Sequence, residues 1–177
     1  TCTGNATALA GNSLTVSAAD TAIVCTYSNT RLQSTLRLAK AWGANSIAGN
    51  VASIGATTGL TNNTALFTST ASTNTNGAFV TVFAGETATL PAETMTTGSL
   101  ANYTTALACD NGVTPSGANG QASNTVTIAA ANAGQAITCT YTNTRRSATL
   151  TLRKSWTNAI VNNAVNLPAT TGFTNNT

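Results

Sequence analysis

The sequence predicts an all-β protein made of tandem sandwich domains, and three observations support this. The apolar residues fall in short, β-branched runs separated by clusters of Gly, Asn and Ser, with no 3.6-residue period sustained over the length of a helix. Eighteen residues, from Cys25 to Trp42, recur from Cys139 to Trp156 with eleven identities. The two copies lie 114 residues apart, which is the size of a domain and well above the roughly 20 to 50 residues of a solenoid unit.

The recurrence divides the chain into three parts. Residues 32–145 form one complete repeat, residues 1–31 correspond to residues 108–145 of that repeat, and residues 146–177 repeat residues 32–64. We therefore expect a C-terminal part of a preceding repeat, a complete sandwich, and an N-terminal part of a following repeat.

Neither partial repeat has enough strands to bury an inner face alone. The chain also begins at Thr1 without methionine or a signal peptide, so a processed protein or a window on a longer array is expected. Strand exchange between subunits is an alternative. Against it, the two partial repeats together lack any equivalent of residues 65–107.

The expected strands follow from alternation and from the turn residues between them. In the first partial repeat they are Ser13 to Val16 and Ala22 to Asn29. In the complete repeat they are Thr35 to Trp42, Ala52 to Ile54, Ala65 to Ser69, Ala78 to Phe83, Thr87 to Leu90, Tyr103 to Cys109, Thr125 to Ile128 and Ala136 to Asn143. Seven or eight strands in a domain of this length are typical of a sandwich or an open barrel.

Residues two apart in a strand share a face. This rule groups Lys40 with the apolar side chains of the first strand, and Asn143 with those of the last. The same face recurs in the second copy as Leu150, Leu152, Lys154 and Trp156, and Lys40 and Lys154 are the only lysines in the chain. A lysine on an apolar strand face in both copies therefore needs an explanation.

Composition indicates an exported surface protein. Charged residues make up 6% of the chain, against about 25% in an ordinary globular protein, so hydroxyl and amide groups must supply its solubility. The net charge of +3 arises from basic residues that all lie near the two junctions: Arg31, Arg37, Lys40, Arg145, Arg146, Arg153 and Lys154. A nucleic-acid-binding protein would need a broader basic face.

The sequence offers little for catalysis or metal binding. Histidine is absent, which removes the commonest general base and metal ligand. The four carboxylates are scattered and cannot form an oxygen cage from neighbouring residues: Asp20, Glu86, Glu93 and Asp110. We expect no enzyme, no cofactor and no metal. No apolar run is long enough to span a membrane as a helix.

The cysteines indicate disulfides. Cys2 with Cys25, and Cys109 with Cys139, each place one member before a Gly/Asn-rich turn region and one on the strand that leads to a junction. A zinc site would require closer CxxC spacing. Two intradomain disulfides are therefore predicted, together with an oxidising compartment.

Four Asn-x-Thr triplets could accept N-linked glycan: Asn5, Asn62, Asn102 and Asn175. In a chain so rich in Thr and Asn, such triplets also arise by chance. They are relevant only if the source glycosylates its secreted proteins.

Several motifs together resemble a known family. They are Leu-x-Lys-x-Trp on the first strand, Leu-Pro-Ala-Glu at Leu90 to Glu93, Tyr-Thr-Thr from Tyr103, and a closing Tyr-Thr-Asn-Thr. The pattern resembles the B-type repeat domains of bacterial collagen adhesins and pilin shafts, which implies a prealbumin-like, immunoglobulin-type sandwich. Cysteines are unusual in the Gram-positive members, and no sorting motif is seen here.

In that family a first-strand lysine and a last-strand asparagine form an intramolecular isopeptide bond, assisted by a buried acid. The resemblance assigns these roles to Lys40, Asn143 and Glu93, with Lys154 and Asn29 as the equivalents in the partial repeats. The chemistry is sound in its own right, because burial removes the lysine proton and a neutral amine is a nucleophile.

A simpler interpretation stays open at this point. Lys40 could extend past Trp42 to solvent, Asn143 could cap the end of its strand, and Glu93 could be an ordinary loop carboxylate.

The sequence thus predicts a structural repeat in the shaft of an extracellular fibre, pilus or giant adhesin on a microbial surface, with copies of itself as partners. The alternative is a module that binds glycan or a host protein and is carried on a stalk of repeats.

Overall fold

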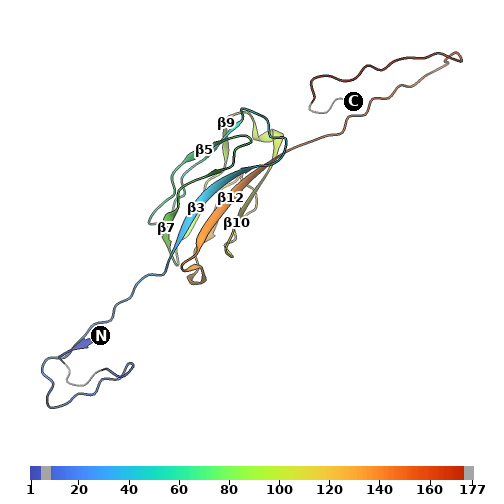
Figure 1. Cartoon of the computed structure of the whole chain (residues 1–177). Coiled ribbons are helices and arrows are strands. Elements are labelled where there is room, and N and C mark those ends of the chain that lie inside the picture. Colours follow the sequence, from blue (N-terminus) through green and yellow to red (C-terminus); the bar gives the residue numbers. More distant parts are fainter. Residues whose placement is uncertain (5–8, 174–177) are drawn as a thin grey trace.

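The computed structural model describes residues 1–4 and 9–173. Apart from two 3₁₀ turns, η1 (Leu100–Asn102) and η2 (Ala130–Asn132), all of the regular structure in the described residues is β. The sandwich lies between Gln33 and Arg145, and the two terminal segments leave it at opposite ends (Figure 1). The prediction of an all-β protein is confirmed.

The first layer is built around the first and last strands of the sandwich, β3 (Gln33–Trp42) and β12 (Ala136–Arg145), which run parallel to each other. On its other side, β12 pairs antiparallel with β10 (Tyr103–Cys109). The other edge of β3 pairs with the short strands β6 (Thr75–Asn76) and β7 (Val80–Phe83). The register of the parallel pair sets Lys40 beside Tyr141, and Trp42 beside Asn143.

The second layer consists of two groups of strands. In one group, β4 (Val51–Ile54) lies between β5 (Phe67–Thr70) and β9 (Thr94–Thr97); in the other, β8 (Thr87–Leu90) pairs with β11 (Asn124–Thr127). Only Pro91–Glu93 separates β8 from β9. Proline has no backbone N–H to donate to a neighbouring strand, which is consistent with the break between β8 and β9 at Pro91.

The core lies between the two layers and is formed by alternate residues of their strands. Leu36 and Leu38 of β3, Ile137 and Tyr141 of β12, and Leu90 of β8 are each at most 1% exposed. From Ser34 to Leu38, β3 alternates between buried and half-buried positions, as expected of a strand with one face on a core.

The predicted strands Thr87 to Leu90 and Tyr103 to Cys109 have those bounds in the structure, and the other strands of the complete repeat differ by one or two residues at one or both ends. β6 and β9 were not predicted. Both are short, and β9 is mostly exposed, so neither has the apolar alternation that identifies a strand in the sequence.

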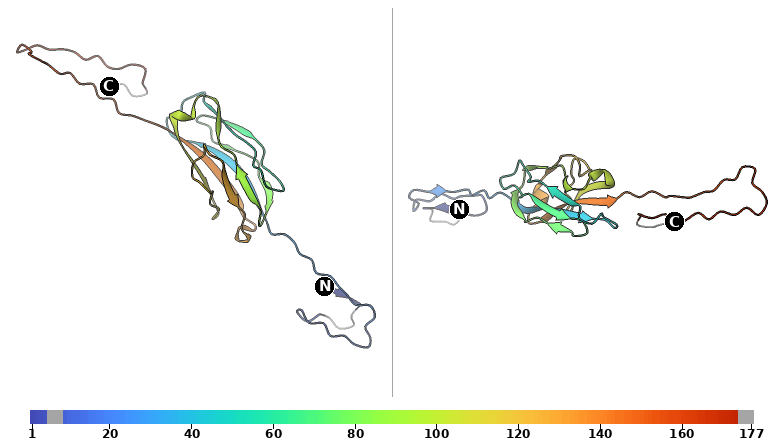
Figure 2. Two further views of the ribbon diagram at one scale, coloured as in Figure 1. Left: turned by 180° about the vertical axis from the view of Figure 1, so that it is seen from behind. Right: turned by 90° about the horizontal axis from the view of Figure 1, so that it is seen from above.

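The terminal segments are less regular than the sequence suggests. The predicted strand Ser13 to Val16 is not a strand, and Ala22 to Asn29 is reduced to β2 (Val24–Cys25), which pairs with β1 (Cys2–Thr3). In the described part of residues 146–177 no strand forms, so the alternation at Leu150 to Trp156 does not produce one. The physical reason is that a strand needs partners, and both segments extend away from the sandwich (Figure 2).

Candidate functional site

The structure brings Lys40, Glu93 and Asn143 together inside the sandwich. The Lys40 Nζ atom lies 3.1 Å from Glu93 Oε1. Asn143 Nδ2 donates a hydrogen bond of 2.8 Å to the same oxygen. Both side chains of the ion pair are 0% exposed, as is the Asn143 residue. One carboxylate oxygen thus touches both an amine and an amide nitrogen in a site without solvent.

Strand geometry positions two members of this cluster. Lys40 follows Leu36 and Leu38 on the inner face of β3, and Asn143 follows Tyr141 on the inner face of β12. Because β3 and β12 are parallel neighbours, these two inner faces form one continuous surface.

Glu93 comes from the opposite layer, at the break between β8 and β9. Its backbone N–H donates to the Gly120 carbonyl at 2.7 Å, and the Tyr141 hydroxyl donates to the Pro91 carbonyl at 2.6 Å. The loop is therefore held at the acid and two residues before it, which fixes the Glu93 side chain against the amine.

Lys40 does not reach solvent, in contrast to the simpler interpretation, because only 1% of the residue is exposed. Its Nζ atom also donates to the Tyr141 carbonyl at 3.4 Å and lies 4.6 Å from the centroid of the Trp42 ring. Aromatic faces attract cations and exclude water. They do not replace the hydration shell of an ammonium group.

Burial shifts both ionisable groups toward their neutral forms. Desolvation lowers the pKa of Lys40 to about 8, although the charge and hydrogen bond of Glu93 oppose this. Desolvation also raises the pKa of Glu93, against the opposing effects of Lys40 and Asn143. Burial thus favours the neutral pair, an uncharged Lys40 amine beside a protonated Glu93 carboxyl, more than water would near neutral pH.

Two atoms of the cluster have no partner. Glu93 Oε2 and Asn143 Oδ1 are buried and make no hydrogen bond. Buried polar atoms are normally satisfied, so an exception needs a reason. A proton on the carboxyl group, where raised pKa favours it, could be donated to the amide oxygen.

Two residues that support the site were not identified from the sequence. Tyr141 anchors the Pro91 carbonyl, and Gly120 lies so close that a Cβ atom there would be 3.0 Å from the Tyr141 ring and 3.7 Å from Glu93 Oε2. The recurrence of this tyrosine as Tyr27 was an available signal. Gly120 had no comparable one.

The equivalents in the partial repeats are not assembled into a site. Asn29 is exposed, and Lys154 is exposed with its Nζ atom 4.5 Å from the Trp156 ring centroid. The Lys–Trp arrangement of β3 therefore recurs, but on exposed residues.

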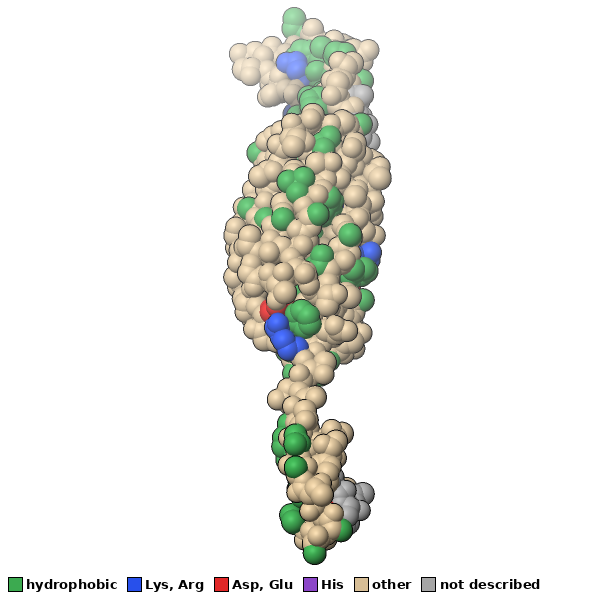
Figure 3. Space-filling view, turned by 90° about the vertical axis from the view of Figure 1, so that its left-hand side faces the viewer, with side chains coloured by type: hydrophobic (Ala, Val, Ile, Leu, Met, Phe, Trp, Pro, Cys, Tyr) green, Lys and Arg blue, Asp and Glu red, His purple; other side chains and the backbone are tan. Residues whose placement is uncertain are grey.

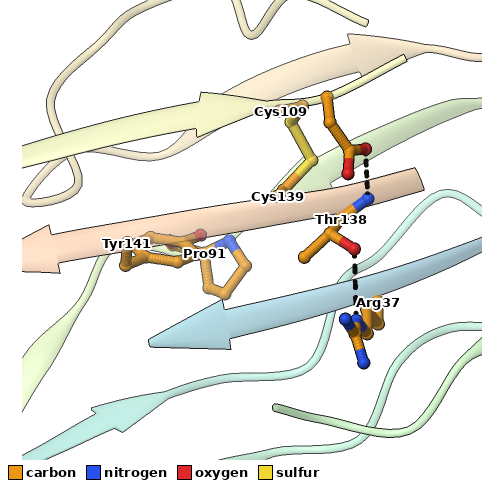
Figure 4. The surroundings of a disulfide bond; sticks show 7 residues. Arg37, Pro91, Cys109, Thr138, Cys139 and Tyr141 are labelled. Atoms are coloured by element: carbon orange, nitrogen blue, oxygen red, sulfur yellow. Dashed lines mark hydrogen bonds between the residues drawn. A yellow bond between two sulfur atoms is a disulfide. The ribbon is translucent and has the colours of Figure 1, made fainter. Parts of the chain in front are cut away.

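Both predicted cysteine pairs are joined as disulfides in the structure, Cys2–Cys25 and Cys109–Cys139. Each joins residues directly opposite each other on antiparallel strands. Beside the second one, Arg37 Nε donates to the Thr138 hydroxyl at 3.1 Å, and the Thr138 N–H donates to Asp110 Oδ1 at 2.6 Å (Figure 4). This disulfide therefore links β10 to β12 next to a polar ladder that continues onto β3.

The asparagines predicted as glycosylation positions do not form a common site. Asn62 and Asn102 are exposed, while Asn5 and Asn175 lie outside the described residues. Within residues 1–4 and 9–173, no group of three or more Cys, Asp or Glu residues could hold a metal ion. No helix in the same part of the chain is long and apolar enough to cross a membrane.

Comparison with known proteins gives a family. The model of a SpaA-type family described as a prealbumin-like fold domain matches residues 52–145, which is more than half of the chain. No curated protein is significantly similar in sequence.

Among solved structures, a bacterial adhesin from Mobiluncus mulieris containing intramolecular disulfide, isopeptide and ester bond cross-links is similar to this chain. The identity is 18% and the TM-score 0.41, with 64% of this chain and 41% of the adhesin chain covered. The chain thus spans about two fifths of that adhesin. With its sandwich and the match to residues 52–145, the chain belongs to the SpaA-type family of prealbumin-like fold domains.

Proposed function

We propose that this chain is a structural repeat of an extracellular fibre, pilus or adhesin shaft, stapled by an isopeptide bond between Lys40 and Asn143. The observation that carries the proposal is the buried cluster in which Glu93 contacts both nitrogens. Membership of a prealbumin-like family supports it. We further propose that the chain acts at the cell surface and that it is no turnover enzyme, since the reaction occurs once within the fold.

The reaction balances with the groups present. Lys40 Nζ, after giving a proton to Glu93, attacks the Asn143 side-chain carbon, and a new C–N bond forms. The protonated Glu93 polarises the carbonyl and delivers its proton to the departing amide nitrogen, so the old C–N bond breaks and ammonia leaves. The attacking nitrogen gives its second proton to Glu93, which ends the reaction protonated, and keeps one hydrogen in the new amide. Glu93 Oε1 lies 3.1 Å from the attacking nitrogen and 2.8 Å from the leaving one, within reach for both transfers.

The position of the bond suits a protein under tension. The chain enters the sandwich at the start of β3 and leaves at the end of β12, and these strands run side by side in parallel. A pulling force would therefore shear them past each other. A link from Lys40 to Asn143 would carry the load from β3 directly to the exit, leaving residues 41–142 outside the load path.

We propose that residues 1–31 and 146–177 are parts of neighbouring repeats. Sequence identity supports this, and so does the first disulfide. Cys2 and Cys25 are directly opposite residues on β1 and β2, as Cys109 and Cys139 are on β10 and β12. On this view the exposed side chains at Leu150, Leu152 and Trp156 correspond to an inner face without its opposing layer.

Cross-link formation should have a bell-shaped dependence on pH. Lys40 and Glu93 together hold one titrating proton, both as an ion pair and as a neutral pair. The ratio of these two forms therefore does not change with pH, and the amount of the reactive neutral pair follows the amount of the singly protonated cluster. The rate should fall above about pH 8, as the cluster loses this proton. It should also fall below the raised pKa of Glu93, as the cluster gains another.

The measurement is the rate of ammonia loss when a chain obtained unfolded and at full mass is first folded at a series of pH values, followed by intact mass. A Lys154→Met variant, which alters only an exposed lysine, should give the same profile. A rate that rises steadily with pH above 9 would show that a free amine alone suffices and that the Glu93 proton is not needed.

Self-association is the expected partner interaction, because few charges oppose contact between copies. Sedimentation at rising concentration should show oligomers. A variant with Ala106→Glu and Ala108→Glu on the exposed side of β10 should remain monomeric at higher concentration. If the unaltered chain stays monomeric and instead binds a glycan or a host protein, the binding-module alternative is favoured.

A further inference from the structure

We propose that the arginine at the end of each repeat docks onto the base of the following repeat, and that Arg31 on Glu86 and Phe83 is one such junction. This inference rests on the proposed division into repeats. It assigns a specific interaction surface, whose partner is the terminal arginine of the preceding repeat in the same chain.

The contact has two components. The Arg31 Nη2 atom lies 3.3 Å from Glu86 Oε1, and the guanidinium carbon lies 4.4 Å from the centroid of the Phe83 ring. A basic, an acidic and a hydrophobic side chain lie side by side where the N-terminal segment meets the sandwich (Figure 3). On a face with few other charged groups, the Arg31 guanidinium is thus held by its ion pair with Glu86 and by its contact with the Phe83 ring.

The acceptor is held in place by its own repeat before the arginine arrives. Glu86 Oε2 accepts from the Phe83 N–H at 3.0 Å. Glu86 Oε1 accepts from the Thr61 N–H at 3.3 Å and from the Thr61 hydroxyl. Burial opposes ionisation, but these hydrogen bonds and Arg31 lower the pKa of Glu86 below its ordinary value. The Glu86 side chain is 9% exposed, so Glu86 loses little side-chain conformational entropy when the arginine docks.

The outgoing end of the sandwich is fixed in a complementary way. Arg146 donates through Nε to the Tyr103 carbonyl at 3.0 Å and through its backbone N–H to the Asn102 carbonyl at 2.9 Å. Arg145, the counterpart of Arg31, donates through Nη1 to the Asn45 carbonyl of its own repeat at 3.3 Å, so its docking on the following repeat is part of the proposal. The chain therefore leaves one repeat from a fixed direction.

The sequence carries the terminal arginine twice, and also one of the acceptor segments. Asn-Thr-Arg ends the last strand at residues 29–31 and again at residues 143–145. The loop that supplies Thr61, Thr-Gly-Leu-Thr-Asn-Asn-Thr at residues 58–64, recurs at residues 171–177 with one substitution. Arg145 is thus followed by the same loop sequence as Arg31 is. Such junctions would set the direction of successive repeats.

The test uses the full chain and ¹⁵N relaxation. The heteronuclear NOE of residues 30–32, and of the Arg31 Nε–H group, should match the values of β3 in the unaltered protein. Arg31→Gln should lower them to the values of residues 150–156. Arg37→Gln is the matched control, because Arg37 also stacks on a phenylalanine, 4.5 Å from the Phe79 centroid, but within one repeat. It should leave residues 30–32 unchanged.

The docking is overturned if residues 30–32 are as mobile as residues 150–156 in the unaltered chain, or if Arg31→Gln leaves them ordered. Intact mass of the same samples reports the Lys40–Asn143 bond separately. A cross-linked chain with a mobile Arg31 would refute only the junction. A chain without the bond but with an ordered Arg31 would refute only the proposed staple.

Discussion

After reduction of its two disulfides, the chain should be lighter than its sequence by one molecule of ammonia, and the variant Asn143→Ala should carry its full calculated mass. The reason is that the amide nitrogen of Asn143 is the leaving group, while the Lys40–Glu93 ion pair stays in place to support folding. Glu93→Gln should likewise carry its own full calculated mass. An amide in place of the carboxyl cannot move a proton from the attacking nitrogen to the leaving one.

Peptide mapping supplies the second measurement. A digest of the unaltered chain should contain a branched peptide that joins the β3 segment with Lys40 to the β12 segment with Asn143. Lys154→Met provides the control, since it removes an exposed lysine and should keep the branched peptide. Full unmodified mass in a chain that shows native tertiary structure would mean that the bond does not form, and that the cluster is a buried ion pair.

Loss of the bond should also reduce stability, to an extent that depends on the variant. Glu93→Ala removes one partner of a buried pair and leaves Lys40 without a counter-ion, a change that costs about 3 to 5 kcal/mol. Asn143→Ala keeps the pair and should cost less. A comparison of the two separates the contribution of the cross-link from the penalty of the unpaired charge.

The fold was predictable where the sequence alternates. β3, β8, β10 and β12 each carry most of their apolar residues at alternate positions, and their predicted bounds agree with the structure to within two residues at each end. Pairing was not predictable in the same way. That β3 and β12 are parallel neighbours depends on how two strands about a hundred residues apart meet, and local pattern carries no information on this.

For the site, alternation placed Lys40 and Asn143 on inner faces. Glu93 could not be placed by parity, because it lies in a break between strands and not within one. Its assignment came from the family resemblance, and the structure supplies the physical reason for its position, namely the hydrogen bonds at Pro91 and Gly120. Those contacts join segments distant in sequence, so only the folded chain displays them.

The terminal segments show the limit of pattern reading. Leu150 and Leu152 have the same alternation as Leu36 and Leu38, yet the first two are 47% and 43% exposed while the second two are at most 1% exposed. The difference is the opposing layer, which covers Leu36 and Leu38 but is missing at Leu150 and Leu152. Alternation in the sequence specifies which side chains share a face, but not whether another layer covers that face.

Replacing Cys109 and Cys139 by alanine should destabilise the sandwich by about 3 to 4 kcal/mol, from the loop-closure entropy of a 30-residue separation. The disulfide ties β10 to β12, and the proposed isopeptide bond ties β12 to β3. Each staple thus restrains a different pair of strands in the unfolded chain, and the sandwich should still fold with either one alone. Thermal and urea unfolding of the variant, followed by near-UV circular dichroism as a probe of core packing, measures the change.

The chain contains a matched control for this experiment. Cys2 and Cys25 are also opposite each other on paired strands, but they lie in the segment outside the sandwich. Their replacement by alanine should leave the unfolding of the sandwich unchanged, while Cys109 and Cys139 should account for the whole effect of a reductant on it. Equal losses from both pairs would mean that residues 1–31 unfold together with the sandwich, and that the first disulfide stabilises the same cooperative unit.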